Sequence, residues 1–178
     1  MSKALLIIDI QNFYFGENGT EGCIEASLKA QKLLYHFREQ GMPVFHVKHD
    51  KDVSRLSDEE KKIVDIHENV KPIEGETIIL KKTPGSFNGT DLLEKLKQNS
   101  IDELIICGMM SNMCVDTTTR EAFDLNFKSI VIHDACATRA YNFNNKEIPA
   151  SYMHASAMAS LAYRFAKVIS TNEFLNQL

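Results

Sequence analysis

Short apolar runs recur along the chain, and stretches with helical spacing separate most of them. The runs are continuous rather than alternating, which is typical of strands buried on both faces of a parallel sheet. The predicted strands are residues 4–8, 43–48, 77–81, 104–107, 128–133 and 168–170. The predicted helices are residues 24–40, 57–65, 90–99, 112–123 and 150–166, followed by a terminal helix. This alternation predicts an α/β fold with a parallel sheet and helices on both faces.

Capping signals fix several of the predicted helix ends. Gly41 suits the C-cap of the first long helix, and Ser57 with Glu60 forms the pattern of a capping box. Thr171 is the predicted cap of the terminal helix. Residues 49–75 are polar and interrupted by Pro72 and Gly75, so they form the least regular part of the chain.

Composition narrows the function classes. With 178 residues, of which 44% are hydrophobic and 25% charged, the chain suits one domain over residues 1–178. A net charge of −4 without a dense Lys/Arg block argues against nucleic-acid binding. No run approaches the ~18 apolar residues of a membrane span, and MSKALLIID lacks a signal peptide's apolar length. We therefore expect a cytoplasmic protein that binds neither nucleic acid nor membranes. Its cysteines at positions 23, 107, 114 and 136 lack zinc-site spacing and are expected to be free thiols.

The stretch ELIICGMMSNMCVDTTTREAF at residues 103–123 carries the first candidate chemistry. An apolar run ends at Gly108, and helical spacing begins at Asn112, which places Cys114 in the first turn of a helix. Unpaired N–H groups and the helix dipole there favour a thiolate, the nucleophilic form of cysteine. The alternative is a small buried hydrophobe, the usual fate of a free cysteine.

Asp9, Lys81 and Cys114 each lie at the carboxyl end of a predicted strand, the edge where open α/β sheets bind ligands. A carboxylate and an ammonium directly after buried strands are costly to bury singly, and together they offset one another. The alternatives are a loop cap for Asp9 and a solvated strand end for Lys81. Lys82 is also compatible with the pattern, although adjacent strand residues point to opposite faces.

Three stretches resemble the signature regions of the isochorismatase-like cysteine hydrolases, the group that includes nicotinamidases, N-carbamoylsarcosine amidohydrolase and isochorismatase. They are DIQNFYF, LKKTPGSFNGTDL and GMMSNMCVDTTTREAFDLNFKSIVIHDACAT. The resemblance implies a three-layer αβα fold with a six-stranded parallel sheet and an Asp-Lys-Cys triad, here Asp9, Lys81 and Cys114. The GSF at residues 85–87 selects Lys81 over Lys82 as the family's lysine.

The resemblance also implies a reaction, the hydrolysis of an amide-type C–N bond of a small molecule through a thioester. Asp9 would act as the base, and Lys81 would favour the ionised forms of Asp9 and Cys114. Backbone N–H groups of Met110 and Cys114 would hold the oxyanion, next to a cis Met109–Met110 bond. The expected pocket residues are Gln11, Phe13, His49, Phe87 and Tyr141.

No metal and no cofactor are expected. Nicotinamidases build a metal site after the second strand, but the corresponding HVKHDKD places His46 and His49 on opposite faces. Two other function classes stay open, a vinyl ether hydrolase of the isochorismatase type and a non-catalytic binding module. The small and aromatic residues of 150–166 predict a homo-oligomer, a dimer or tetramer.

Overall fold

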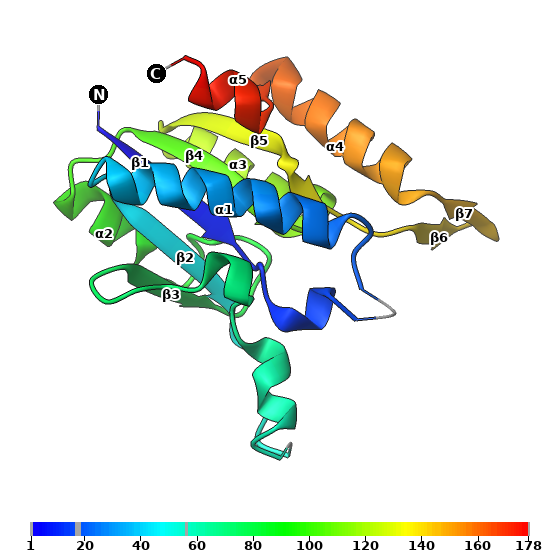
Figure 1. Cartoon of the computed structure of the whole chain (residues 1–178). Coiled ribbons are helices and arrows are strands. Elements are labelled where there is room, and N and C mark those ends of the chain that lie inside the picture. Colours follow the sequence, from blue (N-terminus) through cyan, green and yellow to red (C-terminus); the bar gives the residue numbers. More distant parts are fainter. Residues whose placement is uncertain (1, 17–18, 56, 178) are drawn as a thin grey trace.

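A six-stranded sheet in the order β3-β2-β1-β4-β5-β8 forms the centre of the molecule (Figure 1). The computed structural model describes residues 2–16, 19–55 and 57–177. All neighbouring strands are parallel. The strands are β1 Lys3–Ile8, β2 Val44–His49, β3 Thr77–Lys81, β4 Glu103–Met109, β5 Lys128–Ala137 and β8 Lys167–Ile169. The predicted α/β architecture and its parallel sheet are confirmed.

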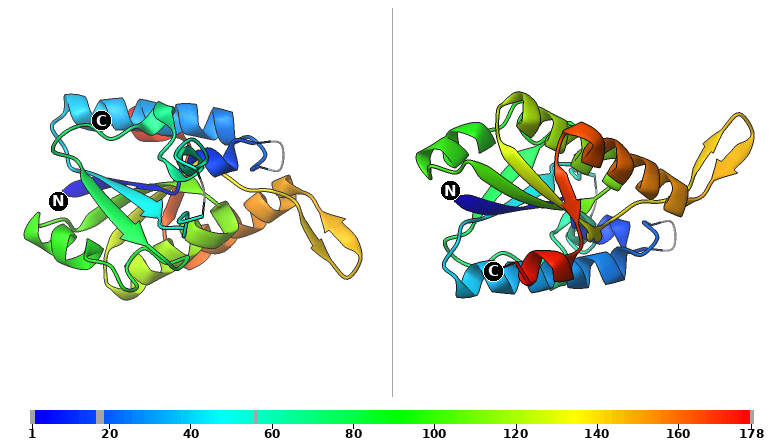
Figure 2. Two further views of the ribbon diagram at one scale, coloured as in Figure 1. Left: turned by 90° about the horizontal axis from the view of Figure 1, so that it is seen from below. Right: turned by 90° about the horizontal axis from the view of Figure 1, so that it is seen from above.

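Helices cover both faces of this sheet. Helix α1 (Cys23–Glu39) and the short α5 (Thr171–Leu175) lie on one face, and α2 (Leu92–Gln98), α3 (Asp116–Asp124) and α4 (Ala150–Arg164) lie on the other (Figure 2). The central strands are therefore buried on both faces, and the side chains of Leu5, Leu6 and Ile105 have no exposed surface. Each such side chain contributes about 1.5–3 kcal/mol by leaving water. No helix of the described ranges is long and apolar enough to cross a membrane.

The fourth and fifth strands run further than the pattern predicts. We expected Gly108 to end β4, but the strand continues to Met109, and β5 passes Asp134 to reach Ala137. The register between these strands shifts between Ile106 and Gly108. Gly108 has a φ of +134°, which only glycine adopts readily, so the strand bends there instead of stopping.

A two-stranded hairpin, β6 (Tyr141–Phe143) and β7 (Lys146–Ile148), was not predicted. Its turn residues Asn144 and Asn145 both have positive φ, as a type I′ hairpin turn requires. Figure 2 shows the hairpin projecting away from the body of the protein. Residues 50–55 and 57–66 form a second projection, named the 50–66 projection after its end residues and visible at the bottom of Figure 1.

Two predicted helix ends change in detail. The N-cap of α5 is Ser170 rather than Thr171, because Ser170 and Glu173 form the reciprocal bonds of a capping box. In the 57–65 segment the predicted helix is a short 3-10 helix, Glu60–Val64. The Ser57 and Glu60 pair is present there, with the Glu60 N–H donating to Ser57 Oγ at 3.3 Å. Two further 3-10 helices are Asn12–Tyr14 and Glu68–Val70.

Candidate active site

Asp9 and Lys81 form a buried ion pair at the carboxyl edge of the sheet. Nζ of Lys81 lies 2.7 Å from Oδ2 of Asp9, and neither side chain is exposed. The same ammonium donates to the carbonyls of Thr83 and Pro84 at 3.0 and 3.1 Å. Apart from the ion pair, the Asp9 oxygens accept no well-aligned hydrogen bond from the described residues. Burial excludes the alternatives of a loop cap and a solvated strand end, and Lys82 is exposed, so Lys81 is the lysine that meets Asp9.

The backbone holds Asp9 in an uncommon conformation. Asp9 has a φ of +51°, in the left-handed region that side chains other than glycine and Asn or Asp seldom adopt. Its N–H donates to the carbonyl of Val47 at 2.9 Å. On the other side, Gly108 lies so close to β1 that an added Cβ would collide with the carbonyl oxygen of Ile8. The position of Asp9 thus depends on contacts with both neighbouring strands.

Cys114 lies in a widened turn between β4 and α3. The Met109–Met110 peptide bond is cis, as the family resemblance implied. The Met110 carbonyl accepts from the N–H groups of Met113 and Val115 at 3.0 and 3.2 Å, and residues Ser111–Val115 form a π-helical turn. Cys114 therefore does lie at the start of a helix, although this first turn is wider than an α-helical one. The expected oxyanion donors, the N–H groups of Met110 and Cys114, belong to this turn.

The pKa of Cys114 is shifted in the opposite direction to that expected, since the helix start was expected to favour the thiolate. The pKa of the thiol is raised to about 12: burial raises it most, the carboxylate of Asp9 raises it as well, and Lys81 lowers it. Cys114 is only 6% exposed, so desolvation outweighs the favourable helix start. At neutral pH the thiol is therefore protonated. Burial also raises the pKa of Asp9, while the charge of Lys81 and contacts with Lys81 and Cys114 lower it.

The side chain of Gln11 forms hydrogen bonds with backbone groups. It is fully buried, and its Nε2 donates to the carbonyls of His49 and Val64 at 3.1 and 2.6 Å. Its Oε1 accepts from the N–H of His49 at 2.7 Å. The Gln11 amide thus joins the end of β2 to the 50–66 projection, and its contact with substrate stays a prediction. His49 itself lies near the triad: burial lowers its pKa, the charge of Lys81 lowers it as well, and Asp9 raises it.

The three expected aromatic walls have different positions. The hydroxyl of Tyr141 lies 3.7 Å from Sδ of Met110, beside the candidate oxyanion donor. Phe13 lies in the 3-10 helix shortly after Asp9 and packs against Tyr14, with ring centres 4.3 Å apart. Phe87 instead stacks on Phe127 at 5.9 Å, beyond the far end of α3. Phe87 is partly buried against the core, and its place in the pocket stays a prediction.

Sequence reasoning missed three residues near the triad: Tyr14, Lys51 and Arg139. Burial raises the pKa of the Tyr14 hydroxyl, and the charges of Asp9 and Cys114 raise it further, which places Tyr14 close to both. Asp9 also acts on Lys51. Arg139 follows the carboxyl end of β5, so the strand-edge rule would have found it had the end of β5 been placed correctly.

His46, His49 and His67 lie in separate surroundings. Nε2 of His46 lies 2.8 Å from Oε2 of Glu76, which also pairs with Arg38 on α1. His67 stacks on Phe15 with ring centres 3.7 Å apart. Neither shares the position of His49 beside the triad. No group of three or more His, Cys, Asp or Glu side chains within the described residues is placed to hold a metal ion.

A hollow of about 320 Å³ lies apart from the triad, between α1, β5 and α4. His133, Asp134 and His154 line it, and Asp9 and Cys114 do not. Nδ1 of His154 lies 2.8 Å from Oγ of Ser111, the residue that follows Met110. The four cysteines, including Cys136 in this hollow, are free and buried thiols, as expected from their spacing.

Comparisons with known proteins agree with this architecture. The isochorismatase domain family matches residues 3–173. The isochorismatase family protein YddQ of Bacillus subtilis (strain 168), described as uncharacterized, is 43% identical over 179 residues, which cover 98% of this chain and 99% of YddQ. The crystal structure of an isochorismatase from Pseudomonas putida KT2440 matches with a TM-score of 0.91 and 35% identity, covering 96% of this chain and 89% of that chain. Nicotinamidase 3 of Arabidopsis thaliana is 33% identical over 101 residues, or 57% of this chain and 46% of that protein.

Proposed function

Because the chain belongs to the isochorismatase family of hydrolases, we propose that it cleaves an amide-type C–N bond of a small molecule through a cysteine thioester. One observation carries this proposal. A fully buried carboxylate and ammonium, 2.7 Å apart, interact with the thiol of Cys114. A protein that only binds a ligand has no need for such a set, because burying both charges is costly.

The first half of the reaction forms the thioester. Since the thiol is protonated at rest, its proton moves to Asp9 as sulfur attacks the carbonyl carbon. The ammonium of Lys81 stabilises the negative charge that passes from Asp9 to sulfur. The carbonyl oxygen becomes an oxyanion, held by the N–H groups of Met110 and Cys114. When the tetrahedral intermediate collapses, the C–N bond breaks and Asp9 returns the proton to the leaving amine.

The second half releases the acid. Water enters the position left by the amine, Asp9 takes a proton from it, and the hydroxide attacks the thioester carbon. Collapse of this second intermediate breaks the C–S bond, and the proton on Asp9 returns to Cys114. The sum is one amide plus one water giving one carboxylic acid and one amine. Every proton transfer uses the same carboxyl group, which fits a site with one buried acid.

Two features support amide chemistry over vinyl ether cleavage. A vinyl ether is cleaved by protonation and water, without a thiol nucleophile, whereas Cys114 lies next to a base. Among the relatives, Nicotinamidase 3 carries a name that states action on an amide. Identity to that protein covers 57% of the chain, so the substrate of this protein is a separate question.

The test is turnover by Cys114→Ser and Cys114→Ala variants. A panel of small primary amides is screened for ammonia release, and the best substrate is used for all variants. We expect a loss of at least about 1,000-fold in kcat for either variant, as for other catalytic nucleophiles. Cys23→Ala is the matched control, because Cys23 is also a buried free thiol and is not one of the three candidate catalytic residues.

Acid-quenched mass spectrometry adds a direct readout. With a slow substrate, the wild-type protein should carry the acyl mass on the peptide that contains Cys114. Circular dichroism establishes that the variants are folded. Turnover by a folded Cys114→Ala variant within about tenfold of wild type would refute covalent catalysis, whatever the substrate.

A further inference from the structure

A histidine of helix α4 is hydrogen-bonded to the π-helical turn Ser111–Val115, which carries Cys114. Nδ1 of His154 lies 2.8 Å from Oγ of Ser111, although the two residues are 43 positions apart in the chain. Ser111 has no exposed surface, and it directly follows Met110, whose N–H is one of the two candidate oxyanion donors. His154 is partly buried and lines the hollow between α1, β5 and α4. Its ring therefore connects this hollow with the turn.

The hydroxyl of Ser111 donates this hydrogen bond, and the imidazole accepts it. Among the described residues, no other group is hydrogen-bonded to Oγ of Ser111. A fully buried hydroxyl proton without an acceptor costs free energy, so the proton points to Nδ1 of His154. Nδ1 accepts when the imidazole is neutral and carries its proton on Nε2. Burial lowers the pKa of His154, and the charge of His133 lowers it as well, which favours this neutral form.

The bonds inside the turn do not attach it to the rest of the protein. The carbonyl of Met110 accepts from the N–H groups of Met113 and Val115 at 3.0 and 3.2 Å, and all three residues belong to the same short segment. The hydroxyl of Ser111 supplies an external attachment, because its partner lies on α4. An oxyanion donor that moves by about 1 Å loses much of its effect on the reaction. An attachment next to Met110 therefore bears on catalysis.

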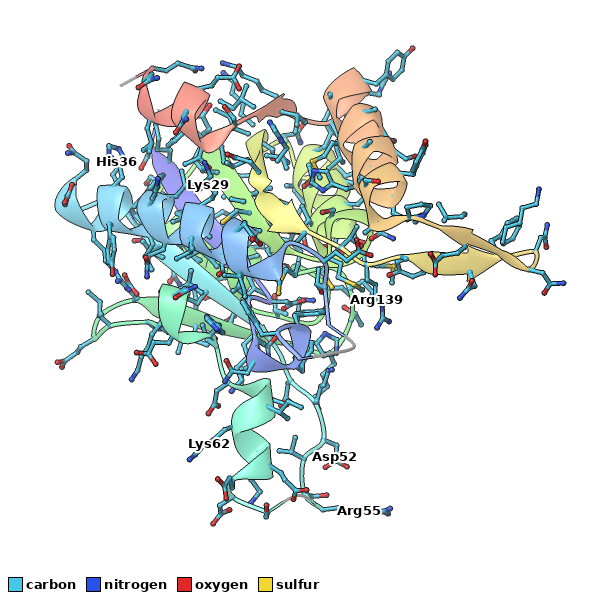
Figure 3. All side chains as sticks on the ribbon, turned by 45° about the vertical axis from the view of Figure 1, so that its right-hand side comes forward. Lys29, His36, Asp52, Arg55, Lys62 and Arg139 are labelled. Atoms are coloured by element: carbon cyan, nitrogen blue, oxygen red, sulfur yellow. The ribbon has the colours of Figure 1, made fainter. Side chains whose placement is uncertain are left out.

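A second side chain of the hollow is attached to the same turn. Thr138 follows β5 and lines the hollow, and its Oγ1 donates to Oδ1 of Asn112 at 2.5 Å. The carboxylate of Asp134, which also lines the hollow, lies 3.5 Å from Nζ of Lys29 on α1 (Figure 3). Two successive residues of the turn, Ser111 and Asn112, are thus hydrogen-bonded to side chains that line one hollow.

We propose that His154 is a positioning residue of the proposed hydrolase: by accepting from the Ser111 hydroxyl, it anchors the turn so that the N–H groups of Met110 and Cys114 point at the oxyanion. The proposal rests on the proposed function for the reaction and on the bond between His154 and Ser111 for the role. His154 acts through Ser111 rather than on the reacting atoms. Because the oxyanion forms only in the transition state, loss of the anchor should lower kcat far more than it raises KM.

Kinetics of three variants test this role with the best amide substrate of the wild-type protein. His154→Leu keeps much of the side-chain volume and removes the acceptor, whereas Ser111→Ala removes only the hydroxyl. His154→Asn returns a polar group close to the position of Nδ1. We expect kcat to fall about 10- to 100-fold in His154→Leu and in Ser111→Ala, with KM changed less than about threefold. His154→Asn should recover kcat to within about fivefold of wild type.

The double variant His154→Leu with Ser111→Ala distinguishes one shared interaction from two unrelated losses. If a single hydrogen bond carries both effects, the double variant should be no more than about twofold slower than the slower single variant, whereas independent losses would multiply. His133→Asn is the matched control, because His133 lines the same hollow and forms no hydrogen bond with the turn among the described residues. Its kcat should stay within about twofold of wild type.

Amide hydrogen exchange of the peptide that contains residues 110–115 provides a readout that requires no substrate. Exchange in this peptide should rise at least about tenfold in His154→Leu and in Ser111→Ala, because the turn opens more often without its anchor. His154→Asn and His133→Asn should leave the exchange close to that of wild type. Urea unfolding shows whether a variant is loosened throughout or in the turn alone. An anchor predicts faster exchange in the turn at nearly unchanged global stability.

Unchanged exchange of the turn in His154→Leu would overturn the proposal, whatever the kcat of that variant. Faster exchange with an unaltered kcat would overturn it as well, because the reaction would then not depend on the anchor. A loss of kcat that multiplies in the double variant would have the same effect. Failure of the hydrolase function is a separate result, since it appears as turnover that Cys114→Ala retains or as a wild type that hydrolyses no amide. In that case the exchange measurement alone decides whether His154 anchors the turn.

Discussion

Replacement of Lys81 by methionine should destabilise the protein through Asp9 rather than through lost packing. Methionine keeps much of the lysine's length and apolar stem, so little volume changes. The ammonium that lies 2.7 Å from Asp9 is removed, and the carboxylate is left buried without a counter-charge. Because both side chains are fully buried, solvent does not screen this loss.

The expected loss of unfolding free energy in Lys81→Met follows from the unpaired charge of Asp9. Removing one partner of a buried ion pair costs about 3–5 kcal/mol. Replacing both partners by neutral groups costs much less, so Asp9→Asn combined with Lys81→Met should lie within about 1–2 kcal/mol of wild type. Lys82→Met is the matched control, because Lys82 is the exposed neighbour and should change the free energy of unfolding by less than about 0.5 kcal/mol.

The stability of the Lys81→Met variant should depend on pH in a defined direction. Burial raises the pKa of Asp9 above its ordinary value of 3.8, and loss of Lys81 removes an opposing influence, so this pKa rises further in the variant. A carboxyl whose pKa is raised by folding destabilises the fold above its unfolded pKa, because it must lose its proton in a buried site. Relative to wild type, the deficit of Lys81→Met is therefore expected to grow as the pH rises above the already raised Asp9 pKa of wild type and to level off at the still higher Asp9 pKa of the variant.

The assay is urea unfolding followed by circular dichroism at about pH 5 and about pH 7.5, for wild type, both single variants of the pair, the double variant and Lys82→Met. The linear dependence of unfolding free energy on urea gives each stability. The reasoning is refuted if Lys81→Met costs less than about 1 kcal/mol at the higher pH, or if adding Asp9→Asn restores none of the loss. Equal deficits at the two pH values would contradict the assignment of the loss to the charge of Asp9.

Three further predictions concern the thiol, the sheet and the assembly. Because the pKa of Cys114 is about 12, the fraction of thiolate should rise about tenfold for each pH unit between about pH 7 and about pH 10, and the rate of alkylation by iodoacetamide should rise with it. Lys81→Met should slow the alkylation at each pH, and Lys82→Met should not. Gly108→Ala, which drives a methyl group into the Ile8 carbonyl, should cost at least about 2 kcal/mol in urea unfolding, and a cost within about 0.5 kcal/mol would contradict the close approach of β1 and β4. The exposed Tyr152 and Tyr163 of α4 lead us to expect a homo-oligomer by light scattering at micromolar concentration, and a monomeric mass would rule it out.

The sheet was predictable because its signals are local. Continuous apolar runs mark buried strands, and the rule that ligands bind at the carboxyl ends of such strands is enough to group Asp9, Lys81 and Cys114 at one edge. The spacing from Lys81 to the GSF turn distinguished it from Lys82, and the fold does bring Lys81 against Asp9. In each case the information lies within a few residues of the feature predicted.

The remaining features depend on contacts distant in sequence. The acidity of Cys114 is set by how deeply the fold buries it, which helical spacing does not reveal. Phe87 turns toward Phe127, forty positions further along the chain, and nothing near Phe87 indicates this direction. Lys51 lies in the irregular segment, where no periodicity assigns a face. The hairpin is different, since the Asn144-Asn145 pair is a turn signal that the sequence contains and that we did not use.

The way in which Gln11 fastens the 50–66 projection has a consequence for how such a protein diversifies. Its amide binds the carbonyls of His49 and Val64 and the N–H of His49, which are groups that nearly every amino acid supplies. Side chains along the projection, including Lys51, are therefore free to be exchanged while the attachment is retained. Substitutions can therefore accumulate along this projection without loss of its attachment, while the buried Asp9–Lys81 ion pair keeps its place at the edge of the sheet.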